Sequence, residues 1–250
     1  MGDLENIYAH YKSVLGRVSI GESIETDKQG NKITIDGEMF RYLVDYYKMN
    51  EFPKVVADEE FDKMPCRMLY HGYKTEEHAA NMMCHFDYHY GTGYINGIFF
   101  TLDSSIALRY TRSSYKDMAD VDKILPVKIS SEKFMTIADL LKIKEARKIQ
   151  DLPEKTSKEQ KEKLQNLYNF ASGLKKREAN DFLKIMKTLS NLAVYLGLDY
   201  VKEPRVKHYI VLNRGILTIP QSKFELLISK SEHYKTGHFD YYDCESQPQT

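Results

Sequence analysis

The stretch that decides the fold is MLYHGYKTEEHAANMMCHFDYHYGTGYINGIFFTLDSSIALRYT, residues 68–111. It predicts a strand over 67–70 that ends on His71-Gly72, followed by a helix that starts at Thr75. An aromatic, glycine-rich loop (86–97) leads to a second strand (98–101) and to a short helix opened by Asp103 or Ser104. We expect the two strands to bring His71 and Phe99 close together, with aromatic side chains around them.

The glycines of this loop, GTGYING, suggest a dinucleotide fingerprint, but their spacing is wrong and no strand precedes them at the required distance. We interpret the segment as a loop over a cleft. Its tyrosines are available for an adenine or an acceptor, although plain loop packing explains them equally well: Tyr88, Tyr90 and Tyr94.

A second group of strands is predicted near the C-terminus. Residues 190–196 form a helical pattern that ends at Gly197, a typical helix C-cap. Short apolar runs follow over 199–201, 207–213 and 216–219, separated by turns. Such closely spaced runs favour a mixed, largely antiparallel sheet.

The flanking segments define the expected domains. Residues 1–60 are predicted to form an N-terminal helical lobe with a hairpin. It contains a helix over 4–18, a hairpin that turns at 27–31 and a helix over 38–48 capped by Asp36 or Gly37. We favour a structural role for this lobe over a role in bordering a cleft. Residues 61–250 form the main domain. Its strand over 122–129 contains Pro126, which predicts an edge or bulge position.

A basic helical insertion over 137–189 interrupts the main domain. Residues 141–187 carry thirteen Lys and Arg against seven Asp and Glu, and Pro153 divides them into separate helices. A solvated helical face explains such a charge run. The functional alternative is a contact surface for RNA, DNA or an acidic partner such as an antitoxin, with 175–177 at its centre.

Composition narrows the class of protein. The 250 residues have a formal net charge of zero, which does not indicate a polyanionic partner for the chain as a whole. Tyrosine is frequent, at 19 residues, which provides either stacking surfaces or simply a tyrosine-rich core. The three cysteines show no metal-ligand spacing, so we expect reduced thiols, a cytoplasmic location and no metal. Neither a signal peptide nor a membrane span is predicted.

Three motifs, in this order, resemble the NAD-binding half of the ADP-ribosyltransferases: LYHG (69–72), GIFF (97–100) followed by LRY (108–110), and HYIVLNR (208–214). They are similar to the poly(ADP-ribose) polymerase and diphtheria-toxin branch, and especially to ADP-ribosyltransferase-like domains of phage head proteins and bacterial toxins. The resemblance covers 66–130 and 188–220. It implies an α+β fold with a split, mixed and largely antiparallel sheet, here with an N-terminal helical lobe and the basic helical insertion.

The resemblance implies that NAD is the substrate and assigns residues to it. His71 would hydrogen-bond the adenosine ribose, and the backbone of Gly72 would hold the nicotinamide amide. Phe99, where the branch usually has tyrosine, and Tyr110 would sandwich the nicotinamide ring. The branch's serine falls on Ala107, so its contact with the nicotinamide amide is missing unless Ser104 or Ser105 replaces it. Neighbouring residues complete the expected NAD-binding set: Tyr73, Thr101 and Ser104.

The chain departs from the branch at the closing strand. Where the polymerases have a glutamate before Tyr-Ile-Val, this sequence has His208. A histidine can bind a ribose hydroxyl and act as a base near neutral pH, but it supplies no negative charge to an oxocarbenium-like transition state. Glu203, five residues earlier, is the alternative, and an inactive site is the third possibility. The expected catalytic set is therefore His208, Glu203 and Tyr110.

The sequence thus predicts a mono-ADP-ribosyltransferase that transfers ADP-ribose from NAD to nucleic acid or protein, as a bacterial or phage-related toxin, toxin–antitoxin toxin or phage-defence effector. Poly(ADP-ribose) synthesis is disfavoured because the glutamate is missing. The alternatives are an NAD glycohydrolase, with water as acceptor, and an inactive transferase fold used for binding or as a structural protein.

Overall fold

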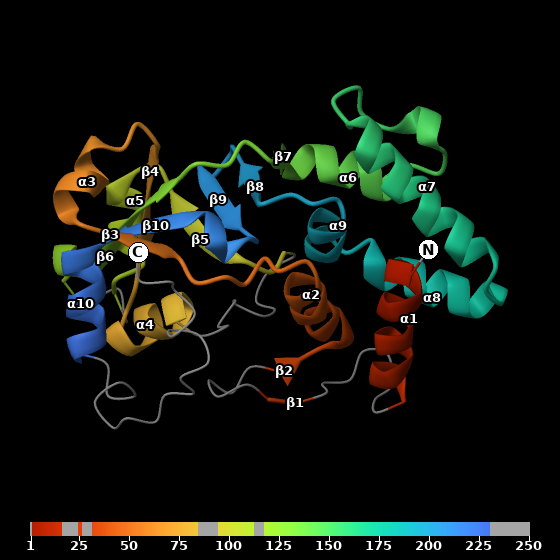
Figure 1. The fold of residues 1–250 in the computed structure, drawn as a ribbon, viewed down its shortest axis with the longest axis horizontal. Coiled ribbons are helices and arrows are strands. Elements are labelled where there is room, and N and C mark those ends of the chain that lie inside the picture. The colour runs from red at the N-terminus through yellow and green to blue at the C-terminus, as the bar shows by residue number, and fades with distance from the viewer. Residues whose placement is uncertain (1, 17–24, 27–31, 85–94, 113–117, 231–250) are drawn as a thin grey trace. The chain divides into compact units, whose positions relative to one another are not determined.

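The chain folds as an α+β protein. The structure, a computed structural model, describes residues 2–16, 25–26, 32–84, 95–112 and 118–230. Within these ranges it contains ten helices and an eight-stranded mixed open sheet of order β3-β10-β6-β4-β5-β9-β8-β7, with a separate two-stranded hairpin, β1-β2 (Figure 1).

The helices are α1 (Gly2–Leu15), α2 (Ile35–Tyr46), α3 (Asp58–Lys63), α4 (Glu76–Cys84), α5 (Ser104–Arg109), α6 (Ile137–Glu145), α7 (Lys158–Ser172), α8 (Lys176–Met186), α9 (Leu189–Tyr195) and α10 (Gln221–Lys230), with 3₁₀ turns η1 (Val121–Lys123), η2 (Ile149–Asp151) and η3 (Arg214–Ile216). The strands are β1 (Glu25–Thr26), β2 (Lys32–Ile33), β3 (Lys54–Val56), β4 (Arg67–Gly72), β5 (Ile98–Thr101), β6 (Ile124–Ile129), β7 (Phe134–Thr136), β8 (Tyr200–Glu203), β9 (His208–Val211) and β10 (Leu217–Pro220).

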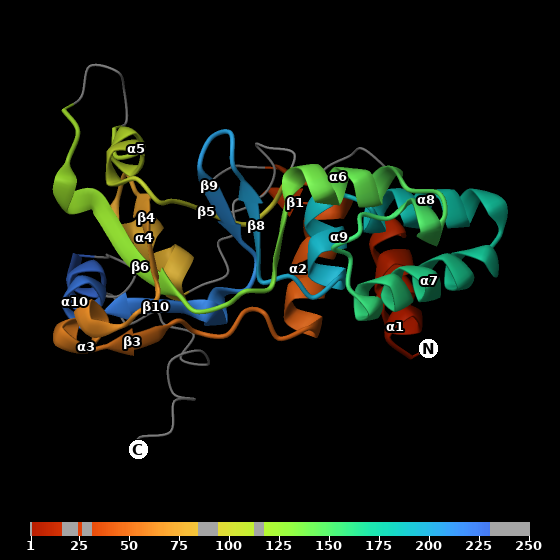
Figure 2. The ribbon, with the colours of Figure 1, turned by 90° about the horizontal axis from the view of Figure 1, so that it is seen from above.

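One compact unit comprises residues 1–48, 89–97 and 133–202 and is mainly helical (Figure 2). On α1 the buried side chains recur at helical spacing, at Leu4, Ile7, Tyr11 and Val14, as a helix needs to present one apolar face. The N-terminal helices and those of the expected insertion over 137–189 therefore belong to the same unit. This unit includes α7 and α8, which Pro153 separates from α6.

The second unit comprises residues 49–88, 98–132 and 203–250 and contains six strands. β6 pairs antiparallel with β4 and β10, β4 and β9 both pair antiparallel with β5, and β3 pairs parallel with β10. α5 packs on β4, and α4 lies beside α10 (Figure 1). Every residue of the expected NAD site lies in this unit.

The sequence predicted an edge or bulge position at Pro126. The strand that contains it, β6, is not an edge strand, because it lies between β10 and β4. The proline is tolerated because β10 pairs only with Lys128 and Ile129 of β6. At Pro126 the one paired neighbour is Tyr70 of β4, so the position is an edge locally although the strand is not.

Several local predictions are confirmed. Asp103 caps α5, and its side chain accepts a hydrogen bond from the backbone N–H of Ser105. Gly197 follows α9 with φ of 75°, as expected of a glycine at a helix C-terminus. The cap of α2, in contrast, is Thr34 rather than Asp36 or Gly37.

Four helices and strands were not predicted from the sequence: α3, α10, β3 and β7. Most of the glycine-rich loop, including Tyr88, Tyr90 and Tyr94, lies outside the described residues, as does the hairpin turn over 27–31. Across the described ranges, no helix has the length and apolar character needed to cross a membrane.

Candidate active site

His71 lies where β4 and β5 separate. β5 pairs with β4 at one position, Tyr70 with Thr101, whereas β6 pairs with β4 along all six residues from Arg67 to Gly72. Immediately after that single pair, Nδ1 of His71 lies 2.7 Å from the main-chain oxygen of Phe99. The imidazole thus makes the hydrogen bond to β5 that the main chain of β4 would make next. This contact confirms the expected closeness of His71 and Phe99.

This contact fixes the chemistry of the imidazole. A carbonyl oxygen only accepts, so Nδ1 must carry the hydrogen and Nε2 is the acceptor nitrogen of the neutral ring. The ring packs edge-on against Phe100, with centroids 5.6 Å apart, and is only 8% exposed. His71 therefore has a defined orientation before any ligand binds.

Gly72 is required by close backbone packing. A Cβ atom at this position would lie 1.9 Å from the carbonyl oxygen of Ala107 and 3.2 Å from Cβ of Tyr110. No rotamer change relieves a clash with main-chain oxygen. Glycine thus allows the last turns of α5 to lie directly on β4, and it brings Tyr110 beside the His71-Gly72 corner.

Half-buried Phe99 and His208 and exposed Tyr110 form the more accessible side of the same group. Antiparallel pairing of β5 with β9 sets Thr101 opposite His208 and Phe99 opposite Ile210. The ring of Phe99 lies edge-on to His208 at 5.9 Å, and the Tyr110 ring lies 6.2 Å from His208. The Tyr110 hydroxyl is 3.4 Å from Nε2 of His208. The structure therefore joins His71, Phe99, His208 and Tyr110 by successive contacts.

Two effects act on the pKa of His208. Burial lowers it, because desolvation disfavours the imidazolium, while the carboxylate of Glu203 opposes this shift. The net shift is downward, so the ring is neutral at pH 7. Glu203, the last residue of β8, accepts a hydrogen bond from the backbone N–H of Arg205 at 3.2 Å, which holds its carboxylate against the turn before β9. Glu203 and His208, at the start of β9, therefore lie within electrostatic reach of each other.

Thr101 and Ser105 make hydrogen bonds within the corner, whereas Ser104 is exposed. Thr101 is buried, and its Oγ1 accepts from the N–H of Asp103 at 3.3 Å. Ser105 donates its hydroxyl hydrogen to Asp103 at 2.6 Å, within the helix cap. Ser104 is exposed at the first position of α5, one turn before the buried Ala107.

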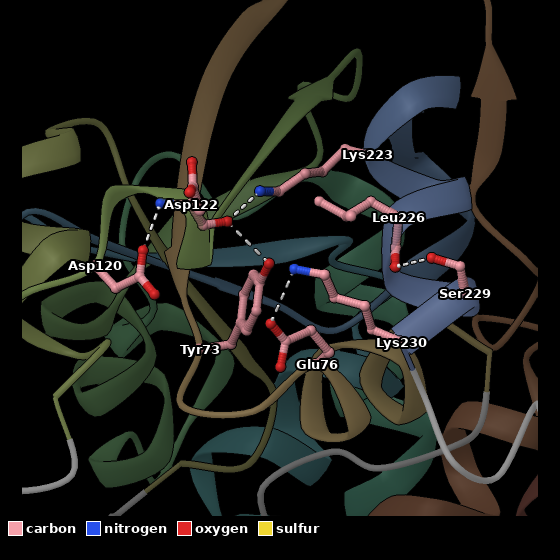
Figure 3. Close-up of polar contacts among 8 residues, drawn as sticks. All are labelled: Tyr73, Glu76, Asp120, Asp122, Lys223, Leu226, Ser229 and Lys230. Carbon is pink, nitrogen blue, oxygen red and sulfur yellow. Dashed lines mark hydrogen bonds and ion pairs between the residues drawn. The ribbon is translucent and has the colours of Figure 1, made fainter.

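Tyr73 is buried and bound internally (Figure 3). Its hydroxyl donates to the main-chain oxygen of Asp122 at 3.0 Å, and its N–H donates to the oxygen of Lys123 at 3.0 Å. Nζ of Lys223, on α10, donates to the same oxygen of Asp122 and lies 5.7 Å from the Tyr73 ring centre. We therefore assign Tyr73 a supporting role behind Gly72. No local motif indicated Lys223, because it comes from a helix far along the chain.

Among the residues that the structure describes, no group of three or more His, Cys, Asp or Glu side chains is placed to hold a metal ion. Comparison with models of protein families, with curated proteins and with solved structures finds no match for this chain. A function must therefore be argued from the residues and their geometry.

Proposed function

We propose that the protein is a mono-ADP-ribosyltransferase that transfers ADP-ribose from NAD to a macromolecular acceptor. The observation that carries this proposal is the contact series from His71 through Phe99 and His208 to Tyr110, closed by Gly72 against α5. Three motifs, at residues 69–72, 97–110 and 208–214, meet at one corner of the sheet. The motifs are those that resemble the NAD-binding strands of the transferases.

The residues fit the parts of NAD by their chemistry. His71, whose Nδ1 is held by the main-chain oxygen of Phe99, is the proposed hydrogen-bond partner of a ribose hydroxyl. The rings of Phe99 and Tyr110 offer apolar faces to the planar nicotinamide. At Gly72 the carbonyl of Ala107 fills the space of a side chain, so the glycine contributes by allowing α5 to bring Tyr110 to the corner.

In the reaction, the bond between the ribose carbon and the nicotinamide nitrogen breaks, and the bonding pair leaves with neutral nicotinamide. A bond then forms between that carbon and an oxygen or nitrogen of the acceptor, which loses a proton. His208 is the proposed base, since a neutral imidazole can accept this proton near pH 7. The Tyr110 hydroxyl next to Nε2 orients the ring or passes the proton onward. Glu203 contributes negative charge to the same corner.

One observation favours a second candidate, an NAD glycohydrolase. Tyr110 is 53% exposed, so water can reach the side of the site where an acceptor must approach. An inactive, binding-only fold remains the third candidate, because histidine replaces the expected glutamate. The acceptor, a macromolecule or water, therefore distinguishes the transferase from the glycohydrolase. Turnover of NAD distinguishes both enzymes from the inactive fold.

The test is incubation with NAD labelled in the adenylate phosphate, with and without cell RNA and protein, followed by separation of macromolecules from small products. We expect label in a macromolecule with the native chain and at least a tenfold loss with Tyr110→Ala and with His208→Gln. The matched control is Leu141→Ala, which truncates another large exposed apolar side chain, 40% exposed and in the other unit. Turnover equal in all four proteins, or none in the native chain, contradicts the proposal. Label found only in free ADP-ribose supports the glycohydrolase.

A further inference from the structure

We propose that the acceptor is single-stranded nucleic acid, bound by an exposed rim around Tyr110 and His208. This inference deepens the proposed function and rests on it, since an acceptor must approach over the residues that border the reacting corner. We define the acceptor rim by six exposed residues: Leu102, Arg109, Tyr110, Arg112, Arg205 and Lys207.

The rim is brought together by two segments. Arg109 ends α5, Tyr110 is its C-cap, and Arg112 follows two residues later. Arg205 and Lys207 belong to the turn that leads into His208. The segments meet where the Tyr110 ring lies 6.2 Å from the His208 ring. Asp103, at the start of α5, also interacts electrostatically with Lys207 of the turn.

The charge of the rim differs from that of the whole chain. Four exposed cations stand here, whereas the chain has a formal net charge of zero. The neighbouring carboxylates include Asp103, Glu203 and Asp120, and each accepts a hydrogen bond from a backbone N–H two residues later. Cations so placed complement the phosphates of a nucleic acid backbone.

Apolar groups are exposed at the same place. Tyr110 is 53% exposed, Leu102 46% and Val206 49%. They make up half of the six large hydrophobic side chains exposed in the described part of the chain. An accessible aromatic ring between cations is the usual platform for an unpaired base. The basic helices α7 and α8 have cations but expose no large aromatic ring, so the rim is the better candidate surface.

The tyrosine also favours single strands over duplexes. A protein ring can stack only on a base that has left its pair, so single-stranded nucleic acid supplies the required face without the cost of unpairing. A protein acceptor would need no such combination of a ring and phosphate-binding cations. Label found only on protein is therefore one outcome of the test.

The test measures nucleic acid binding separately from NAD turnover. Fluorescein-labelled single-stranded RNA and DNA of mixed sequence are titrated by fluorescence anisotropy. The rim variant is Arg109→Gln/Arg112→Gln/Arg205→Gln/Lys207→Asn, where asparagine suits the positive φ of 57° at residue 207. The control, Lys175→Gln/Lys176→Gln/Arg177→Gln/Lys184→Gln, removes the same charge from exposed positions of the other unit.

We expect the rim variant to bind at least about tenfold more weakly and with a shallower salt dependence, while the control stays within about twofold of the native chain. If four phosphates are contacted, native affinity falls about fiftyfold between roughly 50 and 200 mM salt. The rim variant should retain NAD hydrolysis to free ADP-ribose, since none of its four positions belongs to the proposed NAD contacts, and should lose labelling of the oligonucleotide.

The two proposals fail in different ways. NAD turnover without oligonucleotide binding, equal loss in rim variant and control, or label only in protein overturns the acceptor inference and leaves the transferase or glycohydrolase standing. Oligonucleotide binding that depends on the rim, without any NAD turnover, supports the surface and contradicts the proposed function.

Discussion

The hydroxyl of Tyr110 lies 3.4 Å from Nε2 of His208, which joins the end of α5 to the start of β9. The distance is at the long end for a hydrogen bond, so the pair is oriented without being tightly locked. Tyr110 can donate to Nε2 only while that nitrogen is unprotonated. The relationship therefore connects the geometry of the corner to the protonation state of one histidine.

The titration of His208 is the first prediction. Because burial lowers its pKa, the midpoint should lie below the ordinary value of 6.5, as followed by NMR of the ring C–H protons. Glu203→Gln should lower the midpoint further, since the carboxylate favours the imidazolium. If His208 is the catalytic base, the acid limb of NAD turnover should shift with it. A midpoint at or above 6.5 in the native chain contradicts the burial argument.

The same pKa has a consequence for stability. With the folded pKa below the unfolded value, the unfolded chain binds more protons at intermediate pH. The contribution of His208 to stability is thus fully present above pH 6.5 and is lost as the pH falls through the folded pKa. His208→Gln should flatten this part of the dependence of the unfolding free energy on pH. An unchanged slope would show that His208 is not buried in the native state.

Gly72→Ala should destabilise the protein by about 3 kcal/mol or more, because the new methyl group meets the main chain of α5 at 1.9 Å. The matched control is Gly173→Ala. There φ is −79° and the nearest atom would lie at 3.4 Å, so we expect a change within about 0.5 kcal/mol. Urea unfolding of both variants measures the difference. Similar small effects would mean that α5 does not rest on β4.

Much of this corner could be predicted from local sequence. Strands β4 and β5 and the cap of α5 follow from apolar runs and from Asp103, whose chemistry acts within a few residues. The closeness of His71 and Phe99 also follows, because both strands belong to one short stretch.

What could not be predicted depends on distant partners. α10 was missed because its apolar face packs against elements distant in the sequence, among them α4 and β3. The internal role of Tyr73 depends on Lys223, one hundred and fifty residues later. Whether Pro126 has a paired neighbour on its second side depends on where the pairing of β6 with β10 stops, and no residue near the proline indicates this.

Lys128→Met should cost about 2–4 kcal/mol. Lys128 is 4% exposed, and its ammonium donates to the main-chain oxygens of Phe61, Asp62 at 3.1 Å and Met64 at 2.9 Å. Methionine fills the space but removes the ammonium donor from these oxygens at the end of α3, of which the Phe61 oxygen keeps the N–H of Met64. Lys63→Met is the control: its side chain is 80% exposed with an ion pair of 3.9 Å, so its loss should cost less than about 0.5 kcal/mol. Equal midpoints in urea would contradict the capping role.

Tyr73 and Lys223 should be energetically coupled, because both donate to the main-chain oxygen of Asp122. That oxygen keeps one donor when either partner is lost, so Tyr73→Phe and Lys223→Met should each cost about 1 kcal/mol or less. The double variant leaves the carbonyl without either donor and should cost more than the sum of the two, by about 0.5–1 kcal/mol. Lys230→Met is the comparison. Its ammonium pairs with Glu76 at 3.7 Å rather than with Asp122, so its effect should add to that of Tyr73→Phe. Additivity in both cycles would show that the Asp122 carbonyl is not the shared acceptor, and that Tyr73 is held behind Gly72 by packing alone.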